Sequence, residues 1–70
     1  MIEVFKTNVK STAEASELVA MLHRHFPASR INFDLGDCDR ILRVEGPDFH
    51  PERVAGLLNE SGYHCSVLDH

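Results

Sequence analysis

The spacing of apolar residues along this chain changes period four times, and that alternation is its strongest constraint on folding. Four segments alternate every second residue, which is typical of strands: Ile2 and Val4; Ile31, Phe33 and Leu35; Leu42 and Val44; Cys65 and Val67. Two segments have the helical spacing of three and four: Ala15, Leu18, Val19, Leu22 and Phe26; Val54, Leu57 and Leu58. The sequence therefore predicts the order βαββαβ.

Both expected helices carry start or stop signals. Ser11-Thr12-Ala13-Glu14 has the S-x-x-E spacing of a capping box, and Pro27 stops the helix that it opens. Pro51 suits the first position of the second helix, where its missing N–H costs nothing. Gly62 suits a left-handed residue just after that helix. Phe49 and Val54 have the positions of a hydrophobic staple at its start.

Two right-handed β–α–β crossings joined by a hairpin predict a ferredoxin-like α+β sandwich. The four-stranded antiparallel sheet would have the order 4-1-3-2, with both helices on one face, and residues 1–70 would form one domain. In this topology the first loop, the hairpin tip and the start of the last strand share one end of the sheet. Ser11, Cys38, His64 and Cys65 are therefore expected near that end.

Composition argues against several classes of partner. The net charge is −4 with neutral histidines, and the seven Lys and Arg form no cluster, which disfavours nucleic acid. No apolar run approaches the ~20 residues of a membrane span, and the acidic third residue, Glu3, disfavours a signal peptide. Two cysteines are too few for a disulfide framework, although a single Cys38–Cys65 bridge stays open. We expect a cytoplasmic protein that binds no membrane.

The element order, the length and the ending Glu60-Ser61-Gly62-Tyr63-His64-Cys65-Ser66-Val67 resemble heavy-metal-associated domains. Leu18 and Leu22 follow the first loop at that family's helical spacing. The resemblance implies the fold of small copper chaperones, whose M-x-C-x-x-C loop precedes the first helix. Here Val9 takes the place of the methionine, and Ser11 and Glu14 take those of the two cysteines. Since Cu(I) prefers sulfur ligands, the resemblance implies a member that has lost its metal site and binds no metal cofactor there.

Other residues offer weaker metal chemistry. Cys38, His64 and Cys65 could supply thiolate and imidazole to zinc or copper, although burial of Cys65 as a small hydrophobe is the stronger reading. Carboxylates crowd the hairpin and could attract calcium or magnesium, but solvated turn residues are expected there: Asp34, Asp37 and Asp39. His23 and His25 point in different directions on a helix, so they do not form a chelating pair, and near the helix C-terminus they offset its dipole.

No nucleophile–base pair, phosphate loop or carboxylate pair can be argued from the spacing, so we expect no enzyme. The favoured function is a protein-interaction or regulatory module. Two alternatives stay open: a metal-handling protein that uses Cys38, Cys65 or histidine ligands, and a small-molecule sensor.

The sheet face without helices is the expected contact surface. The residues expected to point toward the helices are Ile2, Val4, Leu42, Val44, Cys65 and Val67. Alternation then sends Phe5, Ile41 and Leu68 to the opposite face, rimmed by Arg43 and Glu3. This surface would mediate self-association or bind a protein partner, with Phe5 as its anchor.

Overall fold

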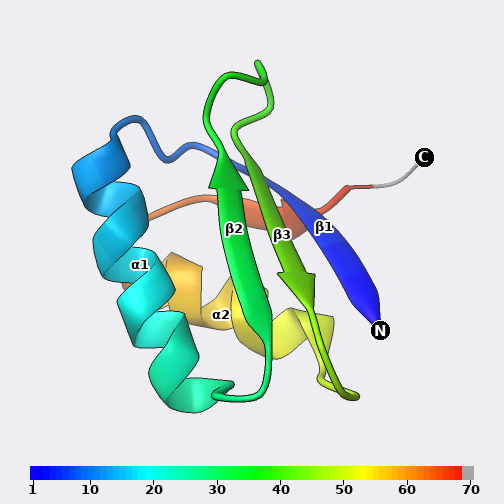
Figure 1. Ribbon diagram of the computed structural model, residues 1–70. Helices are drawn as coiled ribbons and strands as arrows, with labels where there is room; N and C mark the ends of the chain where they lie inside the picture. The colour runs from blue at the N-terminus through cyan, green and yellow to red at the C-terminus, as the bar shows by residue number, and fades with distance from the viewer. Residues whose placement is uncertain (69–70) are drawn as a thin grey trace.

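A computed structural model describes residues 1–68 of the chain and has the expected order of elements (Figure 1). The elements are β1 (Ile2–Thr7), α1 (Thr12–His25), β2 (Arg30–Asp34), β3 (Ile41–Glu45), α2 (Pro51–Glu60) and β4 (Cys65–Val67). Within residues 1–68, no helix is long and apolar enough to cross a membrane.

The four strands form one antiparallel sheet in the order β2-β3-β1-β4, which is the predicted order read from the other edge. Both helices lie on one face of the sheet, and the opposite face is turned toward the viewer in Figure 1. Helix α2 packs on β4, while α1 lies beside β2. The predicted α+β sandwich is therefore confirmed.

Helix α1 begins at the predicted capping box. The Ser11 hydroxyl accepts a hydrogen bond from the Glu14 amide at 3.1 Å, and the Glu14 carboxylate accepts one from the Ser11 amide at 3.1 Å. At the other end, the Phe26 amide donates to the Leu22 carbonyl, and Pro27 follows. The sequence signals thus fix both ends of this helix.

Helix α2 begins differently, because its N-cap residue, His50, makes no side-chain capping bond. Pro51 opens the helix as predicted; Val54 belongs to the buried core cluster, and the partly buried Phe49 packs against that cluster. At the end, Gly62 has a φ of +96°, its amide donates to the Asn59 carbonyl, and the Tyr63 amide donates to the Leu58 carbonyl. This pair of bonds is a Schellman motif, which only a residue with positive φ allows.

The core lies between the helix-covered face of the sheet and the two helices. Its largest fully buried side chains come from β1, the loop after β1, α1, β3 and α2: Phe5, Val9, Leu22, Leu42, Val44, Val54 and Leu58. Leu42, Val44 and Cys65 point toward the helices as predicted. Val67 shares a row with Phe5 but is 41% exposed, because β4 is an edge strand.

The predicted orientation of β1 is wrong by one residue. Phe5 is 0% exposed and faces the helices, whereas Ile2 is 58% exposed and Val4 is half-buried on the opposite face. Phe5 pairs with Leu42 and Val67, and Leu42 pairs with Phe33, so Phe5 joins a row of the sheet that is apolar across all four strands. Burying a large aromatic side chain there stabilises the fold more than burying the smaller Ile2, the first residue of the strand.

Candidate functional site

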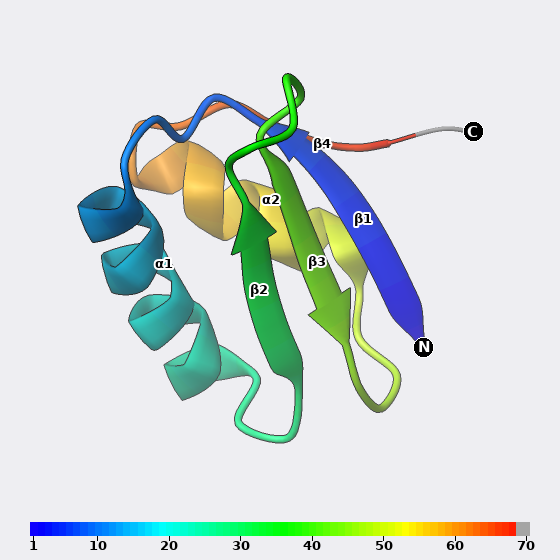
Figure 2. The same ribbon diagram turned by 45° about the horizontal axis from the view of Figure 1, so that its top comes forward.

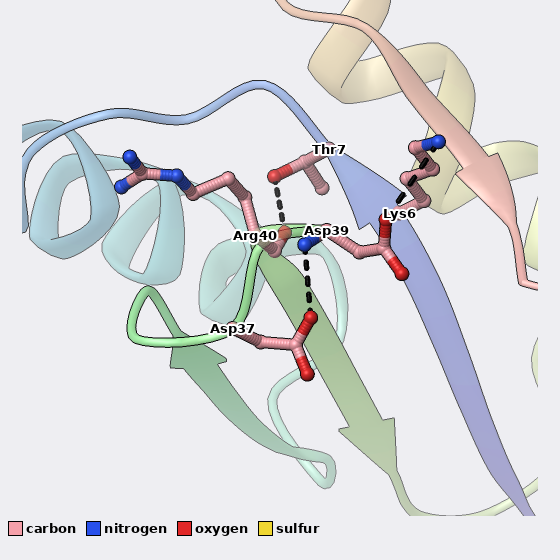
Figure 3. Close-up of polar contacts among 5 residues, drawn as sticks. All are labelled: Lys6, Thr7, Asp37, Asp39 and Arg40. Carbon is pink, nitrogen blue, oxygen red and sulfur yellow. Dashed lines mark hydrogen bonds and ion pairs between the residues drawn. The ribbon is translucent and has the colours of Figure 1, made fainter.

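One end of the sheet gathers the segments that the sequence expected to meet: the loop after β1, the β2–β3 hairpin and the start of β4 (Figure 2). Thr7 lies at the centre of this end and pairs with Cys65 across the sheet. Its hydroxyl donates to the Arg40 carbonyl, and its amide donates to the Asp39 carbonyl at 3.1 Å. Lys6 forms an exposed ion pair with Asp39 at 3.7 Å (Figure 3). The hairpin is thus tied to β1 by polar contacts.

Glu14 ties the first loop to the exit of α2. One carboxylate oxygen accepts from the amides of Lys10 and Ser11, at 3.2 and 3.1 Å, and the other accepts from the Tyr63 hydroxyl at 3.1 Å. Next to this contact, the His64 amide donates to the Asn8 side chain at 2.8 Å. Elements separated by about fifty residues in the chain are therefore joined at this end.

Hydrogen bonds and burial at this contact shift two pKa values in opposite directions. The hydrogen bond from the Lys10 amide is the main reason why the pKa of Glu14 lies below its ordinary value, and the Tyr63 hydroxyl adds to the effect. Burial raises the pKa of Tyr63, and its bond to the Glu14 carboxylate raises it further. Glu14 is therefore held as a carboxylate and Tyr63 as a neutral donor.

The residues at the three positions aligned with the M-x-C-x-x-C loop do not suit a soft metal. Val9 is fully buried in the core. The Ser11 hydroxyl and the Glu14 carboxylate bind each other's backbone amides, and Glu14 also binds Tyr63. The atoms that Ser11 and Glu14 could offer to a metal are oxygens, and these oxygens already accept structural hydrogen bonds. Cu(I) prefers sulfur ligands.

The alternative ligands Cys38, His64 and Cys65 are not brought together. Within residues 1–68, one group of three potential metal ligands has its ligand atoms within 4.8 Å of one another. That group is Asp37, Cys38 and Asp39, and it includes neither His64 nor Cys65. Cys38 is exposed at the hairpin, while Cys65 is buried and its burial raises its pKa to about 12. A thiol with that pKa stays protonated near neutral pH, and metals bind the thiolate. Neither cysteine forms a disulfide bond, so the two are not bridged.

The hairpin aspartates act as turn residues, as expected. The Asp37 side chain accepts from the Asp39 amide at 2.8 Å (Figure 3), and Asp34 accepts in the same way from the Gly36 amide at 3.1 Å. Arg40 completes the turn with a φ of +48°. On α1, the His23 ring lies 3.1 Å from the Ser29 carbonyl, a contact between the helix and the segment before β2 that the sequence did not predict.

The open sheet face carries apolar side chains that differ partly from the predicted ones. Ile41 and Leu68 are half-buried there, as expected. Phe5 is absent from it, and its place as the central apolar residue is taken by Val4, which pairs with Arg43 and whose carbonyl accepts from the Leu68 amide. The strand register pairs Glu3 with Val44, so Glu3 lies on the helix side and does not rim this face.

A longer stretch of alternation would have identified the correct face of β1. Phe5, Thr7 and Val9 are all buried, so the buried series starts at Phe5 and runs beyond the end of the strand. The residues Ile2, Val4, Ile41 and Leu68 are called the open-face cluster below.

Comparisons of the chain with models of protein families, with curated proteins and with solved structures found no match.

Proposed function

We propose that this chain is a small cytoplasmic protein-interaction module, a heavy-metal-associated-like domain that has lost the family's metal loop and is not an enzyme. The observation that carries the proposal is that Ser11 and Glu14, in the loop before α1, make structural hydrogen bonds. The residues aligned with the metal ligands are occupied by a helix cap and by the contact between Glu14 and Tyr63. With that loop committed to structure, the open-face cluster is the surface left for recognition.

The chemistry of the open face supports a protein partner. Ile2 is 58% exposed, and Val4, Ile41 and Leu68 are each partly exposed. The exposed charges of Lys6 and Arg43 flank these apolar side chains. An apolar centre with a polar margin is the arrangement found in contact surfaces. Two cysteines without a bridge are consistent with a reducing compartment.

The first experiment tests the loss of the metal loop. The reduced protein competes with a chromogenic Cu(I) chelator, next to a variant in which Cys38→Ser and Cys65→Ser are combined. We expect the two proteins to compete equally weakly, because no thiolate pair occupies the loop before α1. Tight one-to-one binding by the wild type that disappears in the variant would instead establish a metal-handling function.

The second experiment tests the open face. A photo-activated cross-linking residue replaces Val4 in one protein and Ala20, which is exposed on α1, in a matched control. After irradiation in the source cells, we expect a discrete cross-linked product from position 4 and background labelling from position 20. Equal labelling from both positions would contradict the proposed contact surface.

A further inference from the structure

Strand β2 is an outer strand, and its pairing leaves two sets of backbone groups directed away from the sheet. Met1 and Gly46 exchange hydrogen bonds in both directions, at 2.8 and 2.9 Å, which fixes the phase of the β1–β3 ladder. Hydrogen-bonded and non-hydrogen-bonded pairs alternate along an antiparallel pair of strands. The backbone groups of Leu42 and Val44 therefore point toward β1 and those of Arg43 toward β2.

The same alternation assigns the backbone groups of β2. Asn32 lies opposite Arg43, so its N–H and C=O point toward β3, as do those of Arg30 and Asp34. The N–H and C=O groups of Ile31 and Phe33 then point outward. These groups are a template for another strand.

A groove of about 410 Å³ lies beside this edge, between β2 and α1. Helix α1 lines it with Ala15, Ser16 and Val19, and β2 lines it with Ile31 and Phe33. Both β2 side chains lie on the helix side of the sheet, and Phe33 is only half-buried. A strand added to the edge would direct its own apolar side chains into this groove.

The sequence of β2 is complementary to itself. In the segment Arg30-Ile31-Asn32-Phe33-Asp34, an antiparallel pairing centred on Asn32 places Arg30 opposite Asp34 of a second copy, twice over. The same pairing places Ile31 opposite Phe33 of the second copy, and a β-branched residue facing an aromatic one is a favourable cross-strand pair. Because Ile31 and Phe33 both direct their backbone groups outward, the hydrogen bonds fit this register as well.

We propose that the β2 edge pairs with β2 of a second copy of this chain, which joins the two four-stranded sheets into one continuous sheet with a two-fold axis at Asn32. A register centred on Ile31 would set Phe33 opposite Ser29, whose backbone N–H and C=O already contact Phe26 and His23. A register centred on Phe33 would set Ile31 opposite Leu35, which lies beyond the end of β2. Both registers also leave Arg30 and Asp34 without a charged partner. The charges therefore select the register centred on Asn32. This contact uses a sheet edge, whereas the proposed function uses the open face.

Charge reversal tests the register. Arg30→Asp places two carboxylates opposite each other at both ends of the contact, and Asp34→Arg places two guanidinium groups opposite each other. We expect each single variant to dimerise about tenfold more weakly than the wild type in sedimentation equilibrium, because two attractive pairs become two repulsive ones. A one-to-one mixture of the two variants restores the attraction at both ends, so we expect the mixture to form a heterodimer of wild-type affinity.

The matched control is Arg43→Asp, which makes the same change of charge on the open face of the inner strand β3. We expect this variant to dimerise like the wild type. Its dimerisation would be lost if the copies met through the open face, so the control separates this proposal from the proposed function. Circular dichroism of each variant confirms that the fold is kept.

Amide exchange provides a readout that needs no substitution. As the protein concentration rises from micromolar to millimolar, the amides of Ile31 and Phe33 should become protected, whereas the Asn32 amide, already bonded to β3, should not change. A protein that stays monomeric throughout this range, or a dimer that is insensitive to both charge reversals, would overturn the proposal.

Discussion

Val4 and Phe5 are consecutive residues of one strand, yet they lie on opposite faces of the sheet in different environments. Phe5 is fully buried between Leu42 and Val67, while Val4 lies partly exposed opposite Arg43. Intrinsic preference does not separate them, since both types favour strands. The two side chains differ in burial because they lie in different rows of the sheet. The cross-strand neighbours of a side chain therefore decide how much it contributes to the stability of the fold.

The largest expected effect follows from this contrast. Phe5→Ala removes a fully buried aromatic side chain from the centre of the core, so the free energy of unfolding should fall by about 3–5 kcal/mol. For Val4→Ala, on the open face, we expect a loss below about 1 kcal/mol. Urea unfolding followed by circular dichroism measures both changes. Equal losses from the two variants would refute the distinction between the two faces.

The second effect concerns Cys65, the buried thiol on the helix side. Its folded pKa of about 12 lies above the ordinary value of 9.0, because burial disfavours the thiolate. As the pH rises, the Cys65 thiol therefore ionises in the unfolded state before it ionises in the folded state. The contribution of this thiol to the free energy of unfolding is complete below pH 9 and declines as the pH rises toward 12. In a Cys38→Ser background, adding Cys65→Ala should make the unfolding free energy fall less steeply over this pH range.

Alkylation of the two cysteines gives an independent check on the same contrast. Cys38 is exposed and Cys65 is buried. In the native protein, Cys38 should react with iodoacetamide at the rate of an exposed thiol, whereas Cys65 should react only when the structure opens. Comparable rates for both thiols in the folded state would show that the helix-covered face is not closed as described.

The sequence was sufficient for the features that are encoded locally. The capping box at Ser11 and Glu14, Pro51 at the start of α2 and Gly62 after its end all act within a few residues of themselves, and all three predictions were confirmed. The strand order followed because few connections of two β–α–β units avoid left-handed crossings. Local signals and simple topology together therefore predicted the fold.

What the sequence did not predict depends on contacts between distant residues. The face of β1 was misjudged because Ile2 and Val4 alternate as regularly as Phe5 and Thr7 within the strand; the buried series that runs on to Val9 and the pairing of Phe5 with Leu42 favour the second pair. The contact between Glu14 and Tyr63 joins residues 49 positions apart and has no local signature. That Ser11 and Glu14 offer oxygen and no thiolate could be read directly, but their structural use in the capping box and in the contact with Tyr63 depends on the fold.

The third expected effect concerns the capping box at the start of α1. Ser11→Ala removes the hydroxyl that accepts from the Glu14 amide, and the free energy of unfolding should fall by about 1 kcal/mol. Thr12→Ala, at an exposed position beside it, is the matched control and should leave the urea midpoint nearly unchanged. An unchanged midpoint in Ser11→Ala as well would mean that the capping box contributes nothing to stability.

The hydrogen bonds accepted by the Glu14 carboxylate should make the stability of the fold depend on pH. The pKa of Glu14 lies below its ordinary value of 4.5 in the folded protein, so its contribution is complete above that value and is lost as the pH falls through the folded pKa. Glu14→Gln should therefore be less stable than the wild type at neutral pH, and the difference should shrink on acidification. A difference that stays constant with pH would assign the effect to packing alone.

The smallest effect is expected for the ion pair between Lys6 and Asp39, which joins β1 to the hairpin on the solvent side. Their side chains are 59% and 38% exposed, so water and salt screen the attraction across 3.7 Å. We expect Lys6→Ala to change the free energy of unfolding by no more than about 0.5 kcal/mol, and a double-mutant cycle with Asp39→Ala to return a similarly small coupling. Thr7, one residue along, holds the same hairpin through two hydrogen bonds: its part-buried hydroxyl donates to the Arg40 carbonyl, and its backbone amide donates to the Asp39 carbonyl. A coupling above about 1 kcal/mol that persists in high salt would show that this exposed ion pair stabilises the fold more than solvent screening allows, and it would contradict the prediction.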